Sequence, residues 1–501
     1  MSELLASQLQ GFVTILNPST LLLLLLGVCL GSVIGALPGM GPAAGTSVLL
    51  PLTLSLSPVN GMVMLSGIYY GAHFGGGITA ILLNIPGTPG AAITAMDGYG
   101  MIKRGRGGAA LGMSQLASFC GGMVSTLVLT FTGVSLAAYA LKFGQAEYFA
   151  LTVMGLFLVT SVTGDFPIKG YLMLLFGLAL GFVGLDKVAG VRRFTFGNIY
   201  LTDGISVVTV LIGLFGFSEI LVTLEQDAAN AYESLRMNQI RVKDLILSKR
   251  DLKDSAPAIL RGTVIGFVVG ALPGAGATIA TVMGYSYQKN KSPNKDIYGD
   301  GAIDGIAVSE SSNNATTSGA MVPMLALGIA GSSTTAILLT ALSMYGIQTG
   351  PQLFTSSGDL VWALIASIYI GNILVVLFNI AFIPSFARFL TAAEKFLVPI
   401  IAVVCIVGVY SLKNRMFEVW LMIIFALLGY FLRKADFPAL PLVLGVILGP
   451  TAEAAFRKAL IQSGGDYTVF FTRPLSCCMF VICIAAVVFQ IVRTVKKRNA
   501  R

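Results

Sequence analysis

The chain has 501 residues, of which 55% are hydrophobic and only 11% are charged, and its mean hydropathy is +0.84. Because a soluble globular protein carries about 25% charged residues, this composition excludes a soluble protein and predicts an integral membrane protein. The formal net charge of +9 does not indicate nucleic acid binding, since the Lys and Arg residues gather in loops and at the C-terminus, as membrane topology requires.

Apolar stretches follow one another along the whole chain. They lie near residues 21–37, 59–83, 108–140, 146–162, 168–185, 205–224, 257–272, 320–345, 360–384, 396–412, 416–432, 438–449 and 475–492. A β-barrel would show alternating segments of about ten residues, and these runs are too continuous for one. We therefore expect an all-α polytopic membrane protein with about 10–12 transmembrane spans and some broken or re-entrant helices.

Three short motifs of the first half return in the same order in the second half. GALPG at 35–39 returns at 270–274, PGTPGAAITA at 86–95 aligns with LGIAGSSTTA at 327–336, and DFP at 165–167 returns at 436–438. Three collinear matches indicate an internal duplication. We expect a first membrane repeat over 1–224, a polar connector over 225–256, a second membrane repeat over 257–492 and a basic cytoplasmic tail over 493–501.

Each predicted repeat contains two apolar helices that Pro or Gly interrupts. The interruptions lie at 37–42 and 84–90 in the first repeat and at 272–278 and 327–333 in the second. A break within the bilayer frees backbone groups that protein, water or ligand must satisfy. The free carbonyls can hold a cation, and the free N–H groups at the start of the next helix can hold an anion. Paired breaks of this kind are typical of secondary transporters, and the alternative for each one is a simple packing kink.

The segment VSESSNNATTSGAMVP (308–323) is the most polar segment among the predicted membrane helices. Glu310, Asn313 and Asn314 would share one helix face, and an ionisable residue at membrane depth is a functional candidate. The alternative is a solvent-exposed loop. His73 is interpreted as a hydrogen-bonded interior residue, and Asp97 as a capping or interfacial group.

The basic residues after the second break do not suit an anion site. Lys103, Arg104 and Arg106 follow Pro89 by a stretch that spans about 20 Å if it is helical, so they are expected to mark a cytoplasmic helix end. An anion would then be held by backbone N–H groups and hydroxyls.

Enzyme classes fit the sequence poorly. His73 is the single histidine, which leaves no His-cluster metal site, and the absence of a G-K dipeptide excludes a Walker A loop. We expect no catalytic residues and no cofactor apart from a coupling ion. A channel, which also uses broken helices and backbone carbonyls, remains the alternative to a transporter.

The motifs taken together carry a family resemblance. They are GALPGMGPAAGTSVLLPLT, ILLNIPGTPGAAITAMDGYGMIKRGRGG, GALPGAGATIA, SESSNNATTSGAMVPMLALGIAGSSTTAILL and DFPALPLVLGVILGP. With them the chain resembles the large membrane subunit (TctA type) of the tripartite tricarboxylate transporters.

The resemblance implies a secondary active transporter of the bacterial inner membrane that imports a small di- or tricarboxylate. It implies coupling to an ion gradient, commonly sodium, two repeats of inverted topology and an elevator-like motion. It also implies two partners, a small membrane subunit of about four spans and a periplasmic solute-binding protein. The alternative is an anion channel, or a carboxylate permease that works without a binding protein.

Carried over residue by residue, the resemblance implies a central substrate site. Its predicted lining is Gly39, Gly41, Asn84, Thr88, Gly90, Gly274, Gly276, Asn313, Asn314, Ser332, Ser333 and Thr334. The candidate sodium ligands are Gly39, Asn84, Gly274 and Asn314, because hard cations prefer oxygen. Ala330 stands where the family motif has proline, and His73 where an apolar or small polar residue is expected, so the carboxylate is left open.

Overall fold

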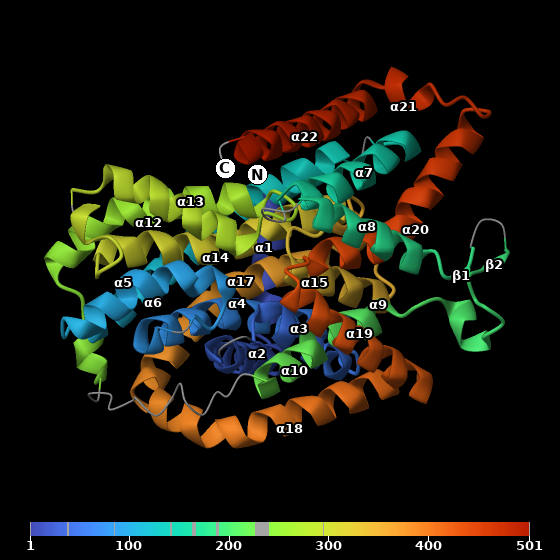
Figure 1. The fold of residues 1–501 in the computed structure, drawn as a ribbon. Coiled ribbons are helices and arrows are strands. Elements are labelled where there is room, and N and C mark those ends of the chain that lie inside the picture. Colours follow the sequence, from blue (N-terminus) through green and yellow to red (C-terminus); the bar gives the residue numbers. More distant parts are fainter. Residues whose placement is uncertain are drawn as a thin grey trace.

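The chain folds almost entirely into helices (Figure 1). The computed structural model describes residues 2–37, 40–84, 86–140, 143–162, 167–186, 190–225, 240–293 and 295–499. The helices of the first half are α1 (Ser2–Ile15), α2 (Pro18–Ala36), α3 (Pro42–Thr53), α4 (Pro58–Leu83), η1 (Pro89–Ala91), α5 (Ala92–Lys103), α6 (Gly107–Ala140), α7 (Gln145–Val162), α8 (Pro167–Gly181), η2 (Ile199–Asp203), α9 (Val207–Leu211), the π-helix η3 (Ile212–Phe217) and α10 (Ser218–Glu225).

The second half continues in the same way. Its helices are η4 (Val242–Leu245), α12 (Lys249–Gly270), α13 (Gly276–Lys291), η5 (Lys295–Ile297), α14 (Ile303–Leu327), α15 (Ser333–Met344), α16 (Leu353–Ser356), α17 (Gly358–Phe382), η6 (Ile383–Ser385), α18 (Phe386–Lys413), α19 (Met416–Lys434), α20 (Ala439–Gln462), α21 (Val469–Thr472) and α22 (Pro474–Asn499). Two short strands, β1 (Gly184–Leu185) and β2 (Arg192–Arg193), pair antiparallel in a small hairpin. The predicted all-α polytopic class is confirmed.

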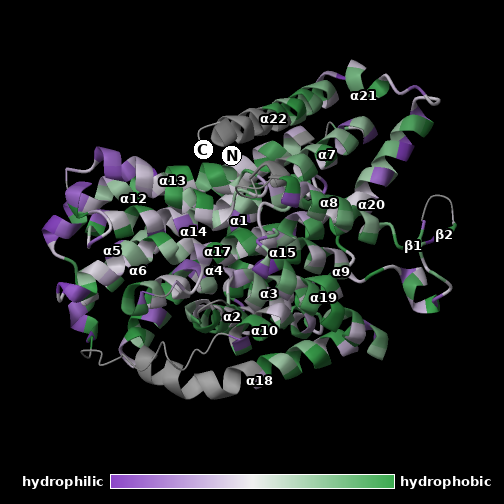
Figure 2. Cartoon of the chain, viewed as in Figure 1, coloured by the Kyte–Doolittle hydropathy of each residue, from purple (hydrophilic) through white to green (hydrophobic). Residues whose placement is uncertain are grey.

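Hydrophilic residues gather at two ends of the molecule. Figure 2 shows them where α12 begins and α13 ends, and again around the β1–β2 hairpin, whereas hydrophobic residues prevail along the helices between. Within the described residues, five helices are long and apolar enough to cross a membrane: Pro18–Ala36, Gly107–Tyr139, Gly358–Ser385, Met416–Lys434 and Ala439–Gln462. This is fewer than the about 10–12 spans expected. Several apolar helices are short, and α14 is long but rich in Ser, Thr and Asn.

Glycines at a spacing of four residues bring pairs of helices into backbone contact. On α2, Gly27, Gly31 and Gly35 each face a backbone carbonyl of α4, so closely that a Cβ at any of them would overlap it. Small residues at this spacing allow helices to approach closely in membranes. The same spacing recurs on α12, where Gly262, Gly266 and Gly270 face the backbone of α14.

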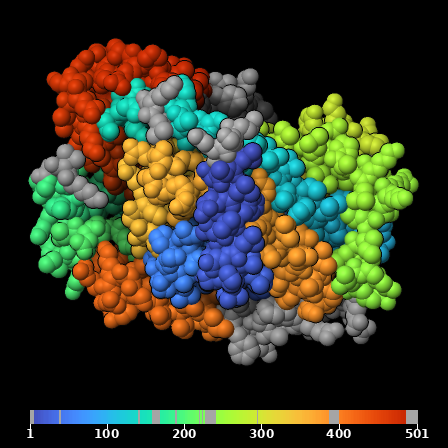
Figure 3. Space-filling model, turned by 180° about the vertical axis from the view of Figure 1, so that it is seen from behind, coloured from blue at the N-terminus to red at the C-terminus, as the bar shows by residue number. Residues whose placement is uncertain are grey.

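Helices of the first half of the chain pack against helices of the second half. The helix α6 of the first half packs along α14 of the second, and α17 of the second half packs along α4 of the first. The short helix α3 contacts α15, and η1 with α5 contacts α13. Figure 3 shows α1 on the surface beside residues of the second half, where it packs on α17. This crossing interleaves the four interrupted segments.

The four interruptions lie where Pro and Gly predict them. The first separates α2 from α3, the second α4 from η1 and α5, the third α12 from α13, and the fourth α14 from α15. Asn84 and Gly328 adopt left-handed conformations at the ends of α4 and α14. Such residues stop helices. The third interruption ends at Gly276, two residues before the expected Thr278, because the left-handed Gly274 and Gly276 form a tight turn.

Ion pairs fix the polar ends of the molecule. Arg106 Nη2 donates to both carboxylate oxygens of Asp251, at 2.7 and 2.8 Å. This ion pair ties the start of α6 to the start of α12. At the other end Arg193 of β2 pairs with Asp186 and Glu453. Of the predicted connector, residues 226–239 lie outside the described residues, as do residues 165 and 166 of the first DFP motif.

Candidate functional site: a cavity at four interrupted helices

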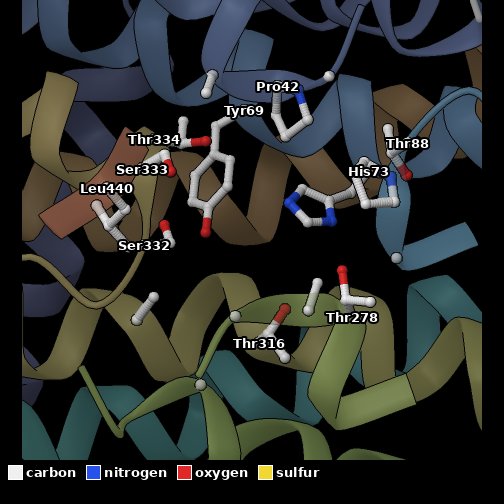
Figure 4. A pocket seen from close by; sticks show the side chains of 18 of the residues that line it. Pro42, Tyr69, His73, Thr88, Thr278, Thr316, Ser332, Ser333, Thr334 and Leu440 are labelled. Carbon is white, nitrogen blue, oxygen red and sulfur yellow. The ribbon is translucent and has the colours of Figure 1, made fainter. Parts of the chain in front are cut away.

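One cavity receives residues from all four interruptions. Its volume is about 330 Å³, within the usual range for small-molecule sites of about 300–1,000 Å³. The residues that the interruptions contribute are Gly41, Pro42, Ala43, Ala44, Thr88, Pro89, Gly90, Gly270, Gly274, Ala275, Gly276, Ala277, Thr278, Ser332, Ser333 and Thr334. In Figure 4 Tyr69 and His73 point into this space from one side, with Thr316 and Thr278 opposite and Ser332 near Tyr69.

Four helices begin at the wall of the cavity. The first-turn residues of α3, η1, α13 and α15 are all part of its lining. In α3, η1 and α13 the residue at the N-cap makes no side-chain hydrogen bond to the first turn. Helix N-termini carry a partial positive charge and N–H groups without an intrahelical partner. The geometry therefore favours an anion in the cavity.

The fourth of these helices has a side-chain cap. The amide of Thr335 donates to Ser332 Oγ, and the amide of Ser332 donates to Thr335 Oγ1, at 3.3 and 2.8 Å. This reciprocal pair is a capping box. Ser333 and Thr334 follow in the first turn and line the cavity, so α15 offers hydroxyls as well as a helix start.

The cavity wall includes the single histidine. His73 is 5% exposed, and its Nδ1 lies 3.1 Å from Asn313 Oδ1. The two side chains share a buried hydrogen bond. A Cβ on Gly90 would collide with that same Asn313 oxygen, so η1 packs directly on the His73–Asn313 pair. His73 is thus the hydrogen-bonded interior residue that was expected, and it also faces the cavity.

Arg433, near the end of α19, adds a charge that the sequence analysis missed. It lines the cavity together with Tyr69, Phe215, Thr316 and Leu440, none of which belongs to an interruption. The second DFP motif starts three residues after Arg433. Because this motif occurs in both halves, it was the sequence signal that could have drawn attention to Arg433. A basic residue in the lining of a cavity onto which helix N-termini open strengthens the preference for an anion.

Eight of the twelve predicted site residues meet at the cavity. They are Gly41, Thr88, Gly90, Gly274, Gly276, Ser332, Ser333 and Thr334. Asn84 is exposed at the end of α4, and Asn313 and Asn314 lie behind the cavity wall. Gly39 lies outside the described residues. Of the proposed sodium ligands, Gly274 lines the cavity, whereas Asn84 and Asn314 are not among its lining residues.

The polar segment 308–323 is buried helix. It forms the middle of α14, whose residues from Asp304 to Ala326 are all buried, so it is not a solvent-exposed loop. Glu310, Asn313 and Asn314 contact the first half, through Thr94, His73 and Ser118 respectively. The expected shared helix face is thus turned toward α4, α5 and α6.

Charged residues at the end of α5 have partners away from the cavity. Arg104 donates to Asp300 at 2.5 Å, and Lys103 lies over the ring of Tyr99 at 4.8 Å. The Asp97 carboxylate accepts the amides of Gly299, Gly301 and Ala302 and the hydroxyl of Tyr285. Asp97 therefore caps the loop before α14, as its expected role requires.

A multi-pass α-helical membrane protein whose interrupted helices surround an anion-favouring cavity has the architecture of a secondary transporter. The chain matches the model of the tripartite tricarboxylate transporter TctA family over residues 21–444. It belongs to that family, which is a family of transporters.

Two relatives from Agrobacterium vitis support the same assignment. One, an uncharacterized 52.8 kDa protein in the TAR-I ttuC' 3' region, is 40% identical over 499 residues, covering 100% of this chain and 98% of the relative. The other, an uncharacterized protein in the TAR-II ttuC' 3' region, is 36% identical over 234 residues, covering 47% of this chain and 97% of the relative. No solved structure matches the chain.

Proposed function

We propose that this chain is the large permease subunit of a tripartite system that imports a small di- or tricarboxylate across the bacterial inner membrane. The import is secondary active transport, coupled to an ion gradient in which sodium is the proposed ion. Membership of the TctA family supports the transporter class. The carboxylate as substrate, sodium as the coupling ion and the inner membrane as the location are proposed in addition to that class.

The observation that carries the proposal is the convergence of four helix starts on one cavity. The first-turn residues with their N–H groups, the hydroxyl-bearing Ser333 and Thr334, and the basic residue Arg433 line a space of about 330 Å³. Each of these groups donates hydrogen bonds, and carboxylates accept them. A ligand with two or three carboxylates matches a wall with several separate anion-binding points better than a ligand with one.

The matched architecture of the halves supports an internal duplication. The glycine triplet on α2 and the triplet on α12 have the same spacing, end at the same point before an interruption, and pack on the next long helix of their own half. We propose that the halves are repeats of inverted topology, as in transporters whose ligand site lies between two such units. Relative motion of the units would then open the cavity to alternate sides.

Two partners are part of the proposed system. A small membrane subunit completes the permease, and a periplasmic solute-binding protein delivers the carboxylate. The cavity is sized for a small ligand, so selection by a separate binding protein would complement a site that uses mostly backbone groups.

Uptake into proteoliposomes tests this function. The liposomes contain the full chain, its small subunit and the binding protein, and uptake of labelled citrate and of C4-dicarboxylates is measured with and without an inward sodium gradient. We expect accumulation above the external concentration only with the complete system and the gradient. Flux that follows the membrane potential and never exceeds equilibrium would instead identify an anion channel, and uptake without the binding protein would identify an independent permease.

A matched pair of variants links uptake to the cavity. Thr334→Val removes a lining hydroxyl at constant volume, whereas Thr132→Val makes the same change on α6, where the hydroxyl bonds the carbonyl of Val128 away from the cavity. We expect only the first variant to lower the affinity. Equal effects would place the site elsewhere.

A further inference from the structure

We propose that Glu310 is a proton-binding site that exchanges its proton during the transport cycle, so that the protein moves a proton as well as its carboxylate. The exchange step rests on the proposed transport function, whereas the protonated state of Glu310 rests on the hydrogen bonds around it. The site lies behind the cavity and shares no residue with its lining.

Glu310 is a buried carboxyl group without an ionic partner. Its side chain is 0% exposed, and within the described part of the chain it forms no ion pair. Its oxygens are bonded by hydroxyls: Thr94 Oγ1 lies 2.6 Å from Oε1, and Ser118 Oγ lies 2.9 Å from Oε2. An isolated charge in such surroundings is costly, because hydroxyls replace only part of the hydration that it loses.

The oxygen–oxygen contacts beside Glu310 outnumber the hydroxyl hydrogens available to them, and Ser309 Oγ also lies 3.1 Å from the Ile306 carbonyl. Three oxygen–oxygen contacts follow in series, from the Gly305 carbonyl to Ser309 Oγ at 2.9 Å, from there to Thr94 Oγ1 at 2.9 Å, and on to Glu310 Oε1 at 2.6 Å. Ser309 and Thr94 have one hydroxyl hydrogen each, so an ionised Glu310 leaves one contact with facing lone pairs. A proton on Oε1 fills all three, since Glu310 then donates to Thr94, Thr94 to Ser309, and Ser309 to the carbonyl.

The second carboxyl oxygen has a fixed donor. Asn314 Nδ2 donates to Ser118 Oγ at 2.7 Å, so the hydroxyl hydrogen of Ser118 is directed to Glu310 Oε2. Ser114 Oγ also faces this carboxyl. Both oxygens border the same small space beside Gly77: a Cβ built on Gly77 would lie 3.0 Å from Ser114 Oγ and 2.8 Å from Glu310 Oε1. Ser114 is fully buried and has no hydrogen-bond partner among the described residues, so it offers a further acceptor or donor when the proton moves.

The protonated site is connected mechanically to the cavity. The segment η1–α5 runs antiparallel along α14, with Gly90 against Asn313 and Thr94 against Glu310. Gly90 lines the cavity, and Thr94 follows it by about one helical turn. A ligand that shifts the second interruption therefore also shifts a hydrogen-bond partner of Glu310. When that partner withdraws, the carboxyl releases its proton to water and becomes the carboxylate, and the reverse step restores it.

Other buried titratable groups lie near α14, and the charged ones among them have partners other than Glu310. The buried ones on helices packed against it are Tyr69, Tyr70 and His73 on α4, Asp97 on α5, Asp251 on α12, Tyr285 on α13 and Asp304 on α14 itself. His73 pairs with Asn313, Asp97 bonds the loop amides, and Asp251 pairs with Arg106. Asp304 accepts from Gln288, Ser292 and Tyr298, and Arg261 of α12 donates to Gln288.

Infrared spectroscopy of the full chain in lipid tests the site without requiring transport. A protonated carboxyl shows a C=O stretching band that a carboxylate lacks. We expect one such band at neutral pH in the wild type, its loss in Glu310→Gln, and a shifted band in Thr94→Val, which removes the acceptor of the proton. A structural role alone would not move the band in Thr94→Val.

The matched control is Glu418→Gln. Glu418 is equally buried and also accepts a threonine hydroxyl, from Thr209 at 2.7 Å, but it pairs with Lys413 at 3.3 Å. It has the cationic partner that Glu310 lacks, so its replacement should leave the band unchanged. A wild-type band that Glu310→Gln does not remove would overturn the proposal, and so would displacement of the band by sodium chloride at constant pH, which would indicate a metal cation at Glu310.

Proteoliposome uptake then separates the exchange step from the proposed function. An inward proton gradient should stimulate uptake by the wild type, and Glu310→Gln should lose that stimulation. Uptake by the wild type that ignores the proton gradient would overturn proton exchange while leaving carboxylate transport intact. Failure of all wild-type uptake, with the infrared band present, would reject the transport function and with it the exchange step.

Discussion

The amide of Gly274 donates a hydrogen bond of 3.1 Å to the carbonyl of Gly331, which ties the third interruption to the fourth. Both residues lie in the loops that follow the long helices α12 and α14, where backbone groups lose their regular helical partners. The bond therefore satisfies two freed groups within the protein and leaves the following helix starts, at Gly276 and Ser333, to face the cavity. The interruptions support one another structurally where they create the site.

The two serines at the start of α15 should separate stability from binding. Ser332→Ala removes the cap of the helix and should lower the free energy of unfolding by about 0.5–2 kcal/mol, together with carboxylate affinity. Ser333→Ala keeps the cap and should lower affinity alone. Thermal unfolding in detergent and equilibrium binding of labelled carboxylate measure the two effects, and an equal loss of stability in both variants would contradict the distinction.

A methyl group at Gly90 should disturb the wall between cavity and α14. Gly90→Ala forces a Cβ against Asn313 Oδ1 and should cost about 1–3 kcal/mol, as overpacking does, with weaker carboxylate binding because the His73–Asn313 pair must move. Gly358→Ala is the control, since nothing lies within 4 Å of its Cβ position. Unchanged binding in Gly90→Ala would show that this wall does not touch the ligand.

Arg433 should matter for binding, and the basic residues of α5 should not. Removing one charged hydrogen-bond donor costs about 1.5–3 kcal/mol, so Arg433→Gln should raise the Kd for the carboxylate roughly tenfold to a hundredfold. Arg104→Gln and Lys103→Gln remove positive charges from outside the cavity lining and should leave the Kd nearly unchanged. Calorimetry or a scintillation proximity assay measures the Kd of each variant. A large increase of the Kd in Lys103→Gln would indicate that the anion site lies near the end of α5.

Asp97 should prove structural. Asp97→Asn replaces a carboxylate that accepts three backbone amides and one hydroxyl, and losing these charge-assisted bonds should lower the free energy of unfolding by about 1–3 kcal/mol. Binding should be unaffected at temperatures where the variant is folded. Full stability with impaired binding would instead give Asp97 a functional role.

Local sequence was sufficient for the interruptions themselves. Pro42 and Pro89 stand at first helical positions, and Gly328 ends α14 in the left-handed conformation, because these preferences depend on a residue's own backbone geometry. The position of Lys103 well beyond the second break was also predictable, because an α-helix rises by a constant amount per residue.

Side-chain partners from distant segments were not predictable in this way. Asn314 was grouped with Gly274 as a sodium ligand, yet it bonds Ser118 behind the cavity. Arg433 was overlooked although it reaches the cavity from α19. Helix faces are set by periodicity, but which neighbour meets a face depends on the crossing of α6 over α14 and of α17 over α4.

The sequence by itself determined that the protein is an all-α membrane protein of a known transporter family, with paired breaks in its apolar helices, because composition, Pro and Gly placement and motif order act locally. Only the tertiary structure decided that the four breaks meet around one cavity, that Glu310 is enclosed by hydroxyls, and that Asn313 serves His73. These features arise from backbone contacts between helices far apart in the chain, such as those that Gly31 and Gly266 permit, and no single segment encodes them.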